Sequence, residues 1–179
     1  MMTIVHANDP TTRFLSHLYE KREDVSVLVT EASTNSDVIR AIRGGDTIMM
    51  LGHGNPYGLF STPDQKDEYR RFLITDRHVQ FLREKTCIGI WCYADQFAQN
   101  YGLHGLFSGM IISELQEAVD YHVRATKEEI DVEMDKFACR LRHCIDRYDL
   151  SEVPMRMQEM NDVTSELNLF NYSHLYYFE

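Results

Sequence analysis

The chain has 179 residues, enough for one domain with its own core, and its 44% hydrophobic and 11% aromatic content argues against disorder. The formal net charge of −10 and the scattered Lys and Arg residues disfavour nucleic-acid binding, because a phosphate backbone is bound by clustered basic side chains. No apolar stretch approaches the roughly 20 residues that cross a bilayer, and the first ten residues lack the pattern of a secretory signal, so we expect a cytoplasmic protein with no membrane contact.

Strands and helices alternate in the first part of the chain. Residues 3–7 and 25–30 are β-rich runs, and each is followed by apolar residues at helical spacing. The first helix is expected after Asp9, with Pro10 in its first turn. The second is expected over residues 33–45, where Gly44 and Gly45 end it.

The middle of the chain continues this alternation. An apolar third strand ends at Leu51, and the long segment 55–75 holds Pro, Gly and a charge run, so we expect a loop or small hairpin that acts as a lid. A helix over residues 75–85 leads to a fourth strand at 86–92, and residues 106–113 are expected to form a fifth.

The clearest helical period lies at residues 126–148, with Thr126 and Glu129 as its capping box. The tail after residue 150 is expected to hold a terminal helix or an edge strand, with Met155, Met157 and Met160 as a helix packing face.

This order of elements predicts an α/β fold. Nearly continuous apolar strands that alternate with helices are typical of a mainly parallel sheet, here of roughly five or six strands, with helices on both faces. We therefore expect a three-layer α/β/α sandwich that spans residues 1–179 as a single domain. In such sheets ligands bind at the carboxyl ends of the strands.

Two of the central strands end in a reactive side chain. His53 follows the third strand, between Gly52 and Gly54, and Cys92 ends the fourth. If these strands are neighbours at ~4.8 Å, the imidazole and the thiol emerge at the same edge of the sheet. A histidine can then deprotonate the thiol for attack and afterwards protonate a leaving amine. The N–H groups of Gly54 and Cys92 are expected to bind the oxyanion.

A hydrophobic strand ending in His-Gly, followed one crossover later by a strand ending in Cys, resembles the caspase-like cysteine peptidases. That fold family includes caspases, metacaspases, legumain, clostripain, gingipains, separase and the CHAT-type bacterial proteases, and the chain is nearest in style to its bacterial members. The resemblance implies a peptidase with His53 as general base, Gly54 in the oxyanion hole and Cys92 as the nucleophile that forms a thioester. It implies no metal or organic cofactor.

The residues around Cys92 depart from the caspase pattern. Ile90 and Trp91 precede it, where caspases have polar residues that recognise aspartate. Three carboxylates, those of Asp95, Glu114 and Glu117, would instead favour a substrate with Lys or Arg. We expect peptide or protein substrates, and regulation by a homodimer, by a partner protein or by the lid.

Several alternatives stay open. Glutamine amidotransferases and α/β-hydrolases need a glycine-flanked nucleophile that precedes its histidine, whereas this chain has Trp91-Cys92-Tyr93 and the reverse order. A catalytically inactive caspase-like or flavodoxin-like binding module remains the main alternative. Cys87, Cys139 and Cys144 are expected to pack in the structure. A zinc site that joins His143 and Cys144 to His104 or His122 is a minor alternative, and His78 is expected to be structural or exposed.

Overall fold

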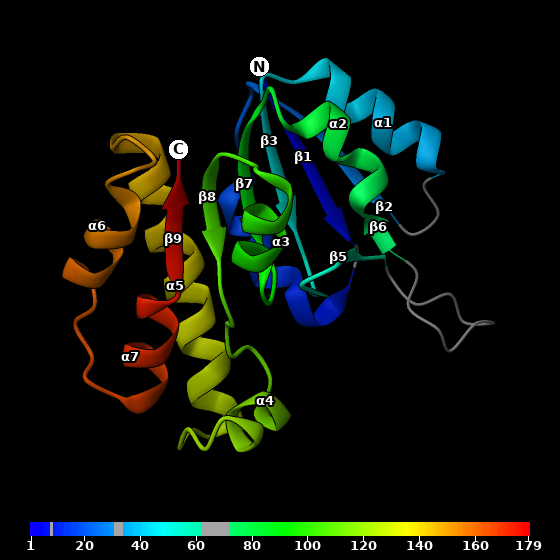
Figure 1. The fold of residues 1–179 in the computed structure, drawn as a ribbon. Coiled ribbons are helices and arrows are strands. Elements are labelled where there is room, and N and C mark those ends of the chain that lie inside the picture. Colours follow the sequence, from blue (N-terminus) through cyan, green and yellow to red (C-terminus); the bar gives the residue numbers. More distant parts are fainter. Residues whose placement is uncertain (8, 31–33, 62–71) are drawn as a thin grey trace.

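The computed structural model describes residues 1–7, 9–30, 34–61 and 72–179 (Figure 1). Strands and helices alternate through most of this part of the chain, as the hydrophobic pattern predicts. The strands are β1 (Met2–Ala7), β2 (Val25–Thr30), β3 (Thr47–Leu51), β4 (Gly54–Asn55), β5 (Gly58–Phe60), β6 (Phe72–Ile74), β7 (Thr86–Ile90), β8 (Gly105–Ser108) and β9 (Leu175–Phe178). The helices are η1 (Pro10–Leu18), α1 (Asn35–Gly44), η2 (Asp76–His78), α2 (Val79–Leu82), α3 (Ala94–Tyr101), α4 (Leu115–Asp120), α5 (Lys127–Arg147), α6 (Val153–Glu159) and α7 (Glu166–Ser173), of which η1 and η2 are 3₁₀ helices.

The described residues form a six-stranded sheet in the order β2-β1-β3-β7-β8-β9. The first five strands are parallel, and β9 runs antiparallel to β8 at the edge. The predicted mainly parallel sheet is therefore confirmed. The parallel order places the carboxyl ends of β1, β3, β7 and β8 side by side at the lower edge of the sheet in Figure 1.

Helices cover both faces of this sheet, which gives three layers (Figure 1). On one face, α1, α2 and α3 pack on side chains such as Val5, Met50 and Phe107. On the other, η1, α5, α6 and α7 pack on side chains such as Ile4 and Leu106. Neighbouring strand residues such as Leu106 and Phe107 belong to opposite cores because successive side chains of a strand point to opposite faces.

Two predicted strands are too long. The run 106–113 ends as a strand at Ser108, because the buried segment beyond it is bound by a side chain instead of a neighbouring strand. The Ile112 N–H donates to Asn171 Oδ1 at 2.8 Å, and Asn171 Nδ2 donates to the Ile112 carbonyl at 2.9 Å. The run 86–92 ends as a strand at Ile90, and Cys92 lies in the turn before α3.

Helix predictions differ mainly in length and type. The first helix is a 3₁₀ helix, and the helix expected over residues 75–85 is reduced to η2 and α2. The helices α3 and α4 were not anticipated. The tail holds two helices and the edge strand β9, so it contains both elements that were considered for it.

The hairpin expected within residues 55–75 is seen as the small sheet β4-β5-β6. Residues 62–71 of the suggested lid lie outside the described part of the chain. Among the described residues, no helix is both long and apolar enough to span a membrane.

Candidate functional site

His53 and Cys92 occupy matching positions beyond two neighbouring strands. The parallel register of β3 and β7 pairs Leu51 with Ile90, and the Gly52 N–H continues this ladder by donating to the Ile90 carbonyl at 3.2 Å. Counting on by the same register brings His53 opposite Cys92, each two residues beyond the paired strands. The two side chains line the same cavity, as their predicted placement requires.

This shared cavity is small. Its volume is about 20 Å³, which is room for about one water molecule. The segments that follow β1 and β8 complete its wall, with Thr12 and Phe14 on one side and Ile111 and Ser113 on the other. The four neighbouring strand ends of the sheet thus each contribute to one site.

His53 is buried, with 8% of the residue's surface exposed, and the polar contacts of its ring come from two elements. Nε2 lies 2.6 Å from Thr11 Oγ1, at the start of η1. The same nitrogen lies 3.7 Å from Glu114 Oε1, just before α4. The ring is therefore held between the segment after β1 and the segment after β8.

The Cys92 thiol is partly buried and also has partners after β8. Its Sγ–H donates to the Ile111 carbonyl at 3.5 Å, and Glu117 Oε1 lies 3.9 Å from the sulfur. Burial, reinforced by the negative charges of Glu117 and Glu114, raises the pKa of Cys92 to about 12. The thiol is neutral at physiological pH in this conformation.

Glu117 is fixed by the backbone around it. Its Oε2 accepts hydrogen bonds from the N–H groups of Ser113 and Glu114, at 2.8 and 3.0 Å, as part of the capping box of α4. The cap therefore positions its carboxylate beside the sulfur.

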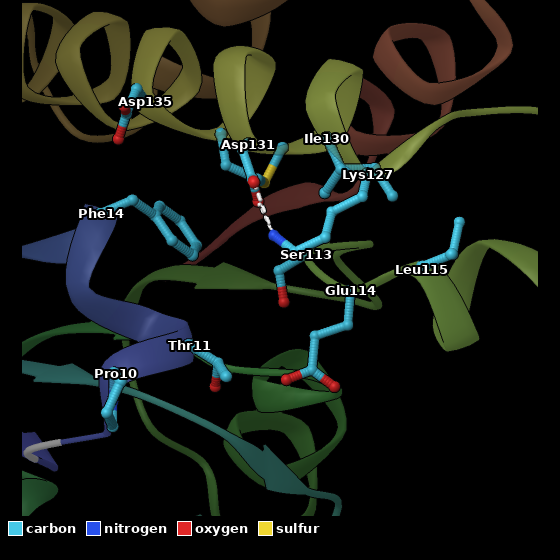
Figure 2. Close-up of a pocket in the computed structure, with 11 residues that line it drawn as sticks. Pro10, Thr11, Phe14, Ser113, Glu114, Leu115, Lys127, Ile130, Asp131 and Asp135 are labelled. Carbon is cyan, nitrogen blue, oxygen red and sulfur yellow. Dashed lines mark hydrogen bonds and ion pairs between the residues drawn. The ribbon is translucent and has the colours of Figure 1, made fainter.

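A larger pocket opens next to this cavity and shares Phe14 and Ser113 with it. Its volume is about 510 Å³, and Figure 2 shows Thr11 and Glu114 reaching into it from opposite sides. Carboxylates exceed amines in its lining, which consists of Pro10, Thr11, Phe14, Ser113, Glu114, Leu115, Lys127, Ile130, Asp131, Met134 and Asp135. Lys127 is already paired with Asp131 at 2.5 Å (Figure 2).

Gly54 lies beside the indole of Trp91. A Cβ at this glycine would come within 2.1 Å of Trp91 Cδ1, so the close approach requires glycine. The Phe60 N–H donates to the His53 carbonyl at 2.8 Å. Hydrogen-bonded pairs alternate along an antiparallel ladder, so the N–H of Gly54, paired with Leu59, points away from β5. Gly54 itself lines neither the cavity nor the larger pocket, so its predicted role as an oxyanion donor stays a prediction.

The three carboxylates predicted to set substrate specificity lie in different places. Glu114 contacts His53 and lines the larger pocket, and Glu117 contacts Cys92. Asp95 lies in the first turn of α3 and lines neither the cavity nor the pocket. Burial raises the pKa of Asp95, and its charge acts on His174 and Tyr176 of the edge-strand region instead.

The remaining cysteines and histidines are distributed through the fold. Cys87 and Cys144 are buried core residues, and Cys139 is exposed on α5. His78 is buried and caps η2 by accepting the Thr75 N–H at Nδ1. Within the described ranges, no group of three His, Cys, Asp or Glu side chains could hold a metal ion.

Three contributors to the site were not predicted from the sequence. Thr11 contacts His53, the Ile111 carbonyl contacts Cys92, and Asp135 of α5 lines the pocket. The expected adjacency of strand ends could have pointed to the segment after β1. For Asp135, no comparable sequence pattern shows which residues of α5 face the segment after β1.

No protein-family model matches this chain, and no curated protein matches it either.

Proposed function

We propose that this protein is a cysteine peptidase of the caspase-like kind. The observation that carries the proposal is that His53 and Cys92, reached from matching ends of neighbouring parallel strands, line one cavity. An imidazole beside a thiol is the pair that thiol peptidases use for nucleophilic catalysis. The adjoining pocket of about 510 Å³ supports a substrate of peptide size.

The proposed reaction has two halves. Cys92 Sγ attacks the peptide carbonyl carbon while His53 takes the thiol proton, and the N–H groups of Gly54 and Cys92 bind the oxyanion. The imidazolium then protonates the leaving amine as the C–N bond breaks, which leaves a thioester. A water molecule, deprotonated by His53, attacks the thioester and releases the carboxylate product and the Cys92 thiol.

Site-resolved alkylation tests this proposal, because Cys139 is an exposed thiol that serves as an internal standard. We expect a peptidyl electrophile such as an acyloxymethyl ketone to modify Cys92 faster than Cys139, measured by mass spectrometry of the modified peptides. His53→Ala should remove this preference for Cys92 and leave the Cys139 rate unchanged. Equal modification of both cysteines in the native protein would contradict the proposal.

An inactive binding module with the same fold is the second candidate. The raised pKa of Cys92 favours it, since a neutral, partly buried thiol is a poor nucleophile. Glu117 and the Ile111 carbonyl already contact the sulfur atom that would have to attack a substrate. For an active peptidase, we infer that substrate or a regulatory partner must displace the segment after β8.

The pocket beside the cavity supports a preference for Lys or Arg in the substrate. Glu114 and Asp135 bring negative charge to its lining, and Lys127 is neutralised by Asp131. We expect fluorogenic peptides with Lys or Arg at the scissile bond to be cleaved in preference to matched peptides with Asp. Preference for Asp would refute this assignment while leaving the peptidase proposal intact.

The cysteines support a reducing compartment. All four are free thiols, as is typical of cytosolic proteins, and we propose a cytoplasmic location on this basis. Regulation by a homodimer or by a partner protein stays a prediction.

A further inference from the structure

A chain of hydrogen bonds links His53 to a carboxylate that the sequence did not bring into the site. Thr11 Oγ1 lies 2.8 Å from Asp9 Oδ1 and 2.6 Å from His53 Nε2. A hydroxyl has one proton, and an ionised carboxylate only accepts hydrogen bonds. The Thr11 proton therefore goes to Asp9, and its oxygen accepts the N–H of His53 Nε2.

This direction of donation decides the tautomer of the ring. A neutral imidazole carries one proton, so a proton on Nε2 leaves the basic lone pair on Nδ1. We propose that Thr11, oriented by Asp9, is a positioning residue that keeps His53 in this tautomer. The catalytic significance rests on the proposed peptidase function, which needs an unprotonated nitrogen of the His53 ring to take the thiol proton.

The local structure explains why the hydroxyl is held in place. Asp9 is the N-cap of η1, and its Oδ1 also accepts the Thr11 backbone N–H at 3.0 Å. The Asp9 N–H in turn donates to the Ala7 carbonyl at the end of β1, at 2.8 Å. Because β1 lies next to β3 in the sheet, this capped turn reaches His53 from the neighbouring strand.

Glu114 adds charge without replacing this hydrogen bond. Its Oε1 lies 3.7 Å from Nε2, which is beyond hydrogen-bonding distance but within ion-pair distance of a protonated ring. Both interactions act on the same nitrogen. The ring is thereby anchored on its Nε2 side by two elements that are independent of β3.

The first test reads the tautomer directly and needs no enzymatic activity. The full chain is labelled with ¹⁵N-histidine, and two-bond ¹H–¹⁵N correlations are recorded at a pH where the ring is neutral. His53→Gln identifies the signals of His53 among the eight histidines. We expect the pattern of an Nε2–H ring, and a native protein with the Nδ1–H pattern would overturn the proposal without any Thr11 variant.

Substitution then tests the role of the hydroxyl. Thr11→Val keeps the shape of the side chain but cannot accept the Nε2–H, so we expect a mixture of the two tautomers. Thr11→Ser keeps the hydroxyl and should preserve the native pattern. An unchanged Nε2–H pattern in Thr11→Val, with its other histidine signals as in the native protein, would show that Thr11 does not set the tautomer.

Kinetics on a cleaved peptide provides the second readout. Thr11→Val should lower kcat by about tenfold to hundredfold with little change in KM. This loss is a fraction of the rate acceleration that general base catalysis contributes. Thr11→Ser should restore kcat. An equal loss in both variants would indicate a structural defect and contradict a positioning role. If the native protein cleaves no peptide, the peptidase proposal fails, while the tautomer measurement still decides the role of Thr11.

Discussion

Single side chains set the resting state of the site. His53 is held by Thr11 and Glu114, and Cys92 is held by the Ile111 carbonyl and lies beside Glu117. Each reactive group therefore contacts residues from other segments of the chain. The negative charge beside the sulfur opposes the thiolate form that a nucleophile requires.

Glu117→Gln should make Cys92 more reactive. Removal of the carboxylate charge lowers the pKa of the thiol, while the amide oxygen of glutamine can still accept the capping hydrogen bonds of Ser113 and Glu114. We expect alkylation of Cys92 by iodoacetamide at pH 8 to accelerate about threefold to tenfold. Site-resolved mass spectrometry gives the rate.

Glu128→Gln provides the matched control, because it makes the same charge change at an exposed position on α5. It should leave the Cys92 rate unchanged. If Glu117→Gln and Glu128→Gln give the same rate as the native protein, the charge of Glu117 does not govern the thiol.

His6 makes the stability of the fold dependent on pH. It is buried on β1 against Tyr19 and Thr12, and burial lowers its pKa to about 4. A lowered pKa means that the folded state favours the neutral ring, so this stabilisation is complete above the unfolded pKa of about 6.5 and is lost as the pH falls toward 4. The full effect is about 3 kcal/mol.

Urea unfolding between pH 7.5 and pH 4.5 measures this effect. His6→Gln removes the titrating ring and should flatten the decline in the free energy of unfolding over that range. His143, which is exposed on α5, offers a control, since His143→Gln should retain the native slope. A native slope in His6→Gln would show that other groups cause the acid sensitivity.

At the scale of elements, the caps determine how well the sequence predicts a helix. The long helix expected at residues 126–148 is observed as α5, Lys127–Arg147, because its apolar period is regular and its capping box is formed. The Glu129 N–H donates to Thr126 Oγ1 at 3.2 Å, and the Thr126 N–H donates to Glu129 Oε2 at 2.8 Å. The capping residues, which are neighbours in the sequence, define the first turn of α5.

Loss of this cap should destabilise the protein measurably. Thr126→Ala leaves the Glu129 N–H without its side-chain acceptor and should lower the free energy of unfolding by about 1 kcal/mol. Thr126→Ser keeps the acceptor and should lie close to the native value in the same chemical denaturation experiment. Equal stability of all three proteins would mean that packing of α5, and not its cap, fixes the end of the helix.

Elements without such local signals were mispredicted. Residues 109–113 are as apolar as a strand, but at Ile112 the backbone hydrogen bonds are made by the side chain of Asn171, far along the chain. The site depends on this segment, because it carries Ile111 and leads to Glu114 and Glu117. Its path between β8 and α4 is set by tertiary contacts that periodicity does not encode.

At the scale of the whole molecule, one sheet separates two cores. Leu141 of α5 packs in the core on one face, and Trp91 belongs to the core on the other. If residues 1–179 are one cooperative domain, as predicted, a defect on one face must be felt on the other.

The single tryptophan makes this testable. Leu141→Ala removes a buried side chain and should lower the free energy of unfolding by about 2–5 kcal/mol. Trp91 fluorescence and far-UV circular dichroism should shift by the same amount, whereas Val132→Ala, exposed on the same helix, should shift neither. Separate transitions for the two signals would contradict a single domain.

The sequence by itself determined the layered α/β fold and the shared position of His53 and Cys92 at one edge of the sheet. Strand and helix periods, and glycines around His53, are local properties of the chain, and parallel strands must end at a common edge. Only the tertiary structure decided what surrounds these residues. Thr11, Glu114 and Glu117 reach His53 and Cys92 through sheet order and through the packing of irregular segments, which depend on contacts between residues distant in the chain.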